Sequence, residues 1–173
     1  MDVFAHIASG ALLGRAVRPT GPAWAAYTFY GAVAGVSPDV DAPLALAGPD
    51  AWAKWHQLYT HSLVGLVWVP LALSLLPFRF APWRTRFLLA LCGWTLHIAL
   101  DLCSRWPVPV FWPLSSQRWA AELLQQDFSW RIDMLLVTAL ALTLWDPARA
   151  YARELAVVSG FVVAGWLALG LPT

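Results

Sequence analysis

Apolar residues gather in six windows along the chain, and most of the charged residues lie between these windows. The windows cover residues 3–17, 19–38, 62–78, 87–103, 132–145 and 155–173. A helix needs about 20 residues to cross about 30 Å of hydrocarbon, and the windows at 19–38, 62–78 and 155–173 approach that length without a charged residue. The pattern predicts an all-α fold, an integral membrane helical bundle of about five to six helices that forms a single domain over residues 1–173.

The other three windows each contain an ionisable side chain. His6 lies in the first window, His97 and Asp101 in the fourth, and Asp133 at the start of the fifth. Hydrocarbon penalises such groups, so they are candidates for function. The first window lacks a basic start and is followed by further windows, so we expect a retained helix rather than a cleaved signal peptide.

Composition supports a membrane protein and argues against one class of partner. Of the 173 residues, 60% are hydrophobic and 12% are charged, whereas a soluble domain carries about 25% charged residues. The 11 Lys and Arg against 10 Asp and Glu give a net charge of +1, so the chain offers no basic surface for nucleic acid. We expect membrane lipid as a partner and no nucleic acid, and the oligomeric state stays open.

The basic residues divide unequally when the six windows alternate across a bilayer. One side holds Arg15, Arg18, Arg79, Arg84, Arg86, Arg149 and Arg153, and the other holds Lys54, Arg105, Arg118 and Arg131. The positive-inside rule then puts the first group in the cytoplasm. This orientation, in a bacterial inner membrane, requires that residues 3–17 cross the bilayer rather than lie on its surface.

Two long connections, residues 39–60 and 104–130, fall on the opposite, extracytoplasmic side. They hold half of the 12 Trp residues, namely Trp52, Trp55, Trp106, Trp112, Trp119 and Trp130. Trp is enriched where protein meets lipid headgroups. Within the second connection, Ser115 is expected to cap a short interfacial helix that turns Trp119 and Leu123 toward the bilayer.

Histidines and aspartates lie close together at several points of the sequence. His97 and Asp101 are four residues apart, so on a helix they share one face and can hold one ion. Asp39 and Asp41 follow Pro38, where an Asp-x-Asp segment can present both carboxylates to one cation or to two. Imidazole with carboxylate suits zinc or manganese, and the absence of thiolate argues against a purely structural zinc site.

The predicted topology brings these groups to one face of the membrane. Polar residues from five windows meet there, and a loop histidine joins them. The candidate metal ligands are His6, Asp39, Asp41, His56, His61, His97, Asp101 and Asp133. A single metal cluster would explain all of them at once.

Each of these residues also has a structural explanation. A histidine near a helix end can simply lie at the interface, and the aspartates after Pro38 can form a turn that ends a helix. His97 and Asp101 can hold the bundle together by a hydrogen bond. Asp133 can cap its helix or pair with Arg131.

At these residues the sequence resembles the membrane-bound metal-dependent hydrolase family, the YdjM-like proteins, some of which are LexA-regulated. The matching elements are His6 with Gly10, Pro-Asp-x-Asp at 38–41, His-x4-His-Ser at 56–62, His-x3-Asp at 97–101, the Trp-Pro segment at 111–119, and Asp133. The family in turn resembles zinc-dependent phospholipases C and P1-type nucleases. That resemblance implies phosphoester hydrolysis, by analogy of fold.

One position departs from the family pattern. The family commonly has Arg directly after the first His of His-x4-His, where this chain has Gln57. If that Arg normally binds phosphate, another cation must take its place here. We therefore expect substrate contacts from Gln57 and from Arg105, Arg118 or Arg131.

Together these patterns predict an integral membrane hydrolase with two or three divalent ions, zinc or else manganese. Asp39, Asp41 and Asp133 are candidates for general base, and a site at headgroup depth favours a phospholipid or lipid-linked phosphate. Two other functions stay open. A small metal or proton transporter would place polar groups at several depths, and a structural membrane protein would bind no metal.

Overall fold

A computed structural model describes residues 2–123, 130–145 and 151–168 as a bundle of helices. In chain order the helices are α1 (Val3–Val17), α2 (Trp24–Val36), the 3-10 helix η1 (Ser37–Ala47), α3 (Pro49–Trp55), α4 (Leu63–Leu75), α5 (Trp83–Cys103), α6 (Trp130–Leu144) and α7 (Ala152–Ala168). Each of the six apolar windows holds one helix. The all-α prediction is confirmed, since the described residues form no β-strand and only an isolated bridge.

The lengths of the helices decide which of them can cross a membrane. Within the described residues, α5 alone is both long enough, at 21 residues, and apolar enough to span a bilayer. The apolar helices α1 and α4 have 15 and 13 residues, which is about 22 Å and 20 Å at 1.5 Å per residue. The prediction of five to six crossing helices therefore still depends on the sequence pattern.

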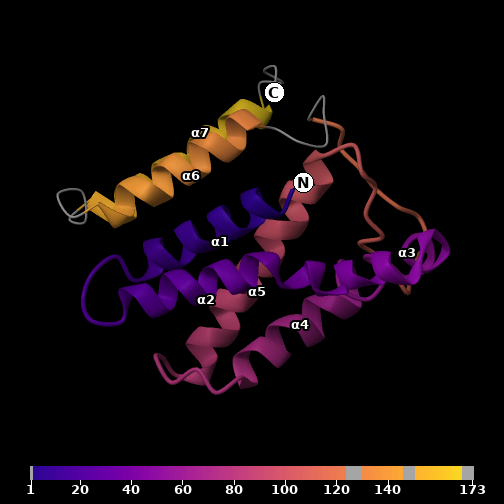
Figure 1. The fold of residues 1–173 in the computed structure, drawn as a ribbon, viewed down its shortest axis with the longest axis horizontal. Helices are drawn as coiled ribbons and strands as arrows, with labels where there is room; N and C mark the ends of the chain where they lie inside the picture. The colour runs from indigo at the N-terminus through magenta and orange to yellow at the C-terminus, as the bar shows by residue number, and fades with distance from the viewer. Residues whose placement is uncertain (1, 124–129, 146–150, 169–173) are drawn as a thin grey trace.

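Two helical hairpins are packed together and crossed by α5. Helix α1 lies along α2, and the hairpin of α6 and α7 packs on α1 (Figure 1). Helix α5 crosses α1 and α2 and holds α4 against it. This arrangement places the end of α5 beside the start of α1, where the chain's N-terminus lies in Figure 1.

Glycines allow α1 and α2 to touch backbone to backbone. Gly10 and Gly14 on α1 face Gly31 and Gly35 on α2. A Cβ added to Gly10 would lie 2.3 Å from the Gly31 carbonyl oxygen, and one added to Gly31 would lie 2.2 Å from the Gly10 oxygen. Small residues four apart on both helices permit such close crossings. The same contact brings the backbone of His6 against Gly35.

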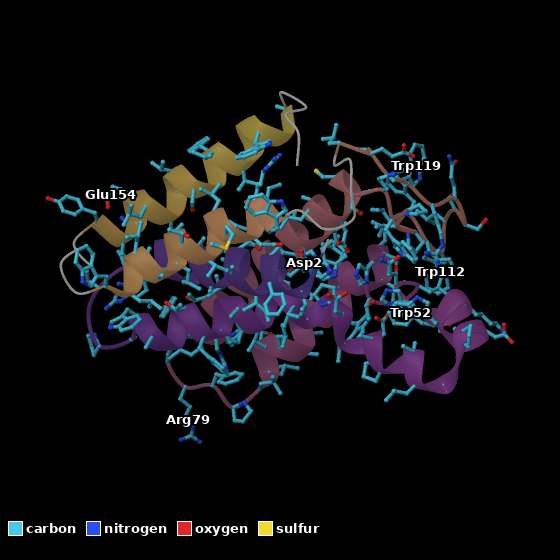
Figure 2. All side chains as sticks on the ribbon, turned by 45° about the horizontal axis from the view of Figure 1, so that its top comes forward. Asp2, Trp52, Arg79, Trp112, Trp119 and Glu154 are labelled. Carbon is cyan, nitrogen blue, oxygen red and sulfur yellow. The ribbon has the colours of Figure 1, made fainter. Side chains whose placement is uncertain are left out.

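Two arginines connect the C-terminal ends of α1 and α6 with the N-terminal end of α7. Arg15 Nη2 donates to the carbonyl oxygen of Thr143 at 2.7 Å, and Arg153 Nε donates to that of Ala16 at 3.0 Å. The ends of α1 and α6 therefore adjoin the start of α7, in the alternation predicted for the windows. Figure 2 shows the tryptophans of the long connections, Trp52, Trp112 and Trp119, at the opposite end of the molecule from Arg79 and Glu154.

The two long connections fold in different ways. Residues 39–60 are largely helical, as η1 and α3. In the second connection the short helix predicted after Ser115 is wrong: residues 115–123 are not helical, and residues 124–129 lie outside the described part. Trp119 instead exchanges two backbone hydrogen bonds with Val108, at 2.8 and 2.9 Å. That pairing requires an extended backbone, which a helix at Trp119 would prevent.

Candidate metal centre

Five of the eight predicted ligands converge where the start of α1, η1, the start of α4 and the end of α5 meet. Asp101 lies at the centre of this cluster. Its Oδ1 is 3.0 Å from His6 Nε2, and its Oδ2 is 3.3 Å from His61 Nε2 and 3.2 Å from His97 Nε2. Asp39 approaches from η1, with Oδ1 3.4 Å from His61 Nε2 and 3.6 Å from His97 Nε2.

The donor atoms of this cluster form two overlapping groups. His6, Asp39 and His97 make one group, and His61, His97 and Asp101 make the other, with all atoms of a group within 4.8 Å of one another. The three imidazoles are 1% exposed or less and Asp101 is 4% exposed. Nitrogen and oxygen donors that lie this close together and are this deeply buried have lost their contacts with water. A bound cation would replace those contacts.

The tautomer of His97 follows from its partner. His97 Nδ1 lies 2.6 Å from the carbonyl oxygen of Gly35, which can only accept, so Nδ1 carries the proton. In the neutral ring the lone pair is then on Nε2, which points into the cluster. Gly35 holds this carbonyl in place through its contact with α1.

The tautomer of His61 is set by a two-step relay. The Thr60 hydroxyl donates its proton to Asp41 Oδ2 at 2.8 Å, so its oxygen accepts the hydrogen bond from His61 Nδ1, also at 2.8 Å. In the neutral ring His61 Nε2 therefore presents a lone pair. It lies 3.0 Å from His97 Nε2, and two lone pairs at this distance repel unless a cation or proton lies between them.

Asp41 is occupied by contacts that orient its neighbours. It accepts from His56 Nδ1 at 2.9 Å, from the Gln57 backbone N–H at 2.8 Å and from Thr60. Burial raises the pKa of Asp41, but these three hydrogen bonds outweigh it and lower the pKa below its usual value. The geometry thus favours an orienting role for Asp41. Carboxylates that fix a histidine in this way are common behind metal ligands.

Burial and the neighbouring groups also have opposite effects on the pKa values of Asp39 and His61. Burial raises the pKa of Asp39, while the adjacent rings of His61, His97 and His6 lower it more. Burial lowers the pKa of His61, while the carboxylates of Asp101 and Asp39 beside the ring raise it more, because they favour its protonated form. The carboxylates are therefore ionised at neutral pH, and they attract positive charge to the cluster.

A cavity of about 380 Å³ opens onto the cluster. Its lining includes Asp39 and Asp101 from the cluster and His56, Trp52 and Trp106 from the long connections. Asp39 is the most open residue of the cluster, with 25% of its side chain exposed. The ring of His56 stacks on Trp52 with centroids 3.6 Å apart. The cluster is thus reached from the Trp-rich end of the molecule.

Asp133 belongs to neither donor group. Its carboxylate interacts with that of Asp2, which caps α1 by accepting from the backbone N–H of Phe4 and Ala5. Both Asp133 oxygens are buried and make no hydrogen bond among the described residues that meets the usual geometric limits. Among the described residues Asp133 makes no hydrogen bond with Arg131, whose guanidinium lies over the Trp130 ring.

Two of the predicted substrate-binding residues touch each other at the cavity. Gln57 lines the cavity with a backbone φ of 68°, a left-handed conformation that is strained for a residue other than glycine. Asp41 holds it there through the Gln57 N–H. Arg118 Nη1 donates to Gln57 Oε1 and to the Pro107 carbonyl oxygen, both at 3.3 Å. Arg105 lies in the segment just after α5.

The motifs of the sequence do not indicate the role of Thr60, nor the packing role of the glycines that position His97. Thr60 directly precedes His61, and Gly10, Gly14, Gly31 and Gly35 are spaced by four in two adjacent windows. That spacing is the signal that could have indicated a close helix crossing.

Comparison with known proteins gives one kind of match. A family model described as "YdjM inner membrane protein" matches residues 1–171. No curated protein and no solved structure matches the chain.

Proposed function

Because the chain belongs to the YdjM inner membrane protein family, we propose that it works at that membrane as a metal-dependent phosphoesterase acting on a phospholipid or a lipid-linked phosphate. The observation that carries the proposal is the pair of imidazole Nε2 atoms 3.0 Å apart. In the neutral rings both present lone pairs, and Asp39 and Asp101 face them. A divalent cation bound between the rings would satisfy both lone pairs and balance the carboxylate charge.

The donor set fits zinc, with manganese as the alternative. His6, Asp39, His61, His97 and Asp101 would hold the ion. His97 offers a single nitrogen, because its Nδ1 is bonded to Gly35, so a second ion would need a bridging carboxylate from Asp39 or Asp101. A divalent ion here would activate water and stabilise charge on phosphoryl oxygens.

Asp39 is the favoured general base among the three candidate carboxylates. It lies in the cluster, lines the cavity and is ionised at neutral pH. Asp41 already accepts three hydrogen bonds, and Asp133 belongs to neither donor group and does not line the cavity. Asp39 can therefore take a proton from a nucleophile in the cavity without breaking a hydrogen-bond network that orients a ligand.

Arg118 is the favoured cation for the substrate anion. It is exposed, and its contact with Gln57 fixes it beside the cavity. A guanidinium can bind a phosphate with two parallel hydrogen bonds. Gln57 then positions Arg118, and Arg118 supplies the positive charge that the family commonly has at the position of Gln57.

Two features support a lipid substrate and an extracytoplasmic site. Trp52 and Trp106 line the cavity, and Trp prefers the depth of lipid headgroups. The seven-to-four division of basic residues supports an orientation with the cluster on the outer face. A phosphate carried by a lipid would reach the cavity at this depth.

A substrate screen tests the proposal. Metal-loaded protein in mild detergent is compared with chelated protein on phospholipids, polyprenyl phosphates and a soluble phosphodiester. We expect metal-dependent release of phosphate or headgroup, greatest with lipids, and a rate lowered by on the order of 10²-fold in Asp39→Asn. Equal background with and without metal on every substrate would reject the phosphoesterase.

Thr60→Val tests the relay that orients His61. Valine keeps the shape of threonine but cannot link His61 to Asp41, so metal affinity should fall by about 10- to 100-fold. The Thr60 carbonyl, which accepts from Trp94 Nε1, is unaffected. Competition with a chromogenic chelator measures the affinity, and Thr28→Val, on α2, is the matched control. Unchanged affinity in Thr60→Val would show that the relay has no role.

A further inference from the structure

A second cavity, of about 540 Å³, lies between α1, α5, α6 and α7. Among the described residues that line it, Ser9, Cys103 and Ser159 alone have polar side-chain atoms. Both serine hydroxyls donate within their own helices, Ser9 to the His6 carbonyl and Ser159 to that of Ala156. Gly160, Ala164 and Ala168 are exposed, so the cavity is open along α7, and its walls offer water few polar partners. The cavity suits an apolar ligand.

Small residues on α7 make room for this cavity. Ala156, Gly160, Ala164 and Ala168 recur every four residues and line one wall. A Cβ added to Gly160 would meet nothing within 4 Å. From Ala156 to Ala168 the wall is about 18 Å long at 1.5 Å per residue. The cavity is therefore long as well as apolar, and its volume lies in the range of about 300 to 1,000 Å³ that is usual for ligand sites.

The cavity adjoins the metal centre across the last turns of α5. Leu100 and Cys103 line the apolar cavity, and Asp101 and Ser104 line the cavity of the metal centre. A ligand with a phosphate at Asp39 and Arg118 could thus carry a hydrocarbon chain round the end of α5 into the apolar cavity. In an inner membrane protein, lipid chains are the apolar molecules that surround these helices.

We propose that this cavity binds one long hydrocarbon chain of the lipid substrate. The inference rests on the proposed function for the identity of the headgroup, and it adds that the enzyme selects lipids by their chain. Soluble phosphoesters and short-chain lipids should bind weakly, because they leave the cavity walls without contacts.

Photo-crosslinking in nanodiscs tests chain binding without requiring turnover. The probe is a phosphatidylglycerol with a diazirine near the end of one acyl chain, and labelled peptides are mapped by mass spectrometry. We expect labelling at cavity residues of α1 and α7. Gly160→Phe should lower this labelling by roughly tenfold, because its ring fills the cavity and one unit of log K is about 1.4 kcal/mol. Metal-free protein should label equally well.

Gly165→Phe is the matched control. Gly165 lies on the same helix, also has open space for a side chain, and does not line the cavity. Phenylalanine raises helix propensity at either position, so both proteins should fold, as checked by circular dichroism. Ala164→Phe is the second cavity variant should Gly160→Phe fail to fold. Equal labelling in the cavity variants and the control, or labelling confined to outward-facing residues such as Phe161, would overturn the proposal.

The two proposals fail in different ways. Cavity labelling without phosphoester hydrolysis would leave the lipid site standing and reject the enzyme. Hydrolysis with no dependence on chain length and no cavity labelling would reject the lipid site and leave the enzyme standing.

Discussion

Asp101→Asn protein is expected to purify with its metal content lowered at least about tenfold. Asp101 touches all three buried imidazoles, at 3.0 to 3.3 Å, so its negative charge interacts with every histidine of the cluster. Asparagine has the same shape but only one oxygen and no charge. His97→Ala should have an equal effect, because it removes the donor that both groups share. Elemental analysis of the purified variants gives the result.

Asp50→Asn is the control for this substitution. Asp50 is exposed in the first turn of α3, away from the described donor groups, and its loss should leave metal content unchanged. Size-exclusion chromatography in detergent separates metal loss from unfolding. Wild-type metal content in folded Asp101→Asn and His97→Ala would show that the pair serves only to hold helices together.

Gly31→Val should prevent the chain from reaching its native fold. The new side chain would begin 2.2 Å from the Gly10 carbonyl oxygen and 2.9 Å from Gly14 N, and backbone atoms on α1 cannot move aside without separating the helices. We expect a loss of more than about 4 kcal/mol in the free energy of unfolding, the exceptional range for one substitution. Yield of monodisperse protein and thermal unfolding in detergent measure this.

The matched variant is Gly165→Val. Its Cβ meets nothing within 4 Å, so stability should change by less than about 1 kcal/mol. Native yield and thermal stability in Gly31→Val would mean that α1 and α2 do not cross as described. That result would also remove the support for the Gly35 carbonyl that orients His97.

Helix positions and the meeting of the polar groups could be predicted from the sequence because both depend on local pattern. Apolar windows locate helices, and a simple alternation of direction brings His6, His61 and Asp101 to one end. His97 and Asp101 share a face because they are four residues apart. None of these inferences requires knowledge of which helices touch.

The remaining features depend on contacts between distant segments. Asp41 resembles a ligand in sequence, but its oxygens are taken by His56, Gln57 and Thr60, and only the folded loop shows this. The sequence places Asp133 with the candidate ligands because it starts its helix at the same end. Its carboxylate lies in neither donor group, and this depends on how α6 is rotated against α1.

The segment after Ser115 shows the same limit. A serine before alternating polar and apolar residues favours a helix start. Here the Ser115 hydroxyl accepts from the Gln117 N–H in a local turn, and Trp119 pairs with Val108. A tertiary pairing thus overrides the local preference.

Metal analysis of wild-type protein is the most direct test of the central claim, that the buried His and Asp cluster holds a divalent cation. Protein purified in mild detergent, without chelator, is analysed by plasma mass spectrometry and normalised to chain concentration. We expect at least about one zinc or manganese ion per chain, because each donor group offers three ligands, which is enough to hold an ion that keeps an open position for water. A content near zero, in protein that is folded and has been offered both metals, would contradict it.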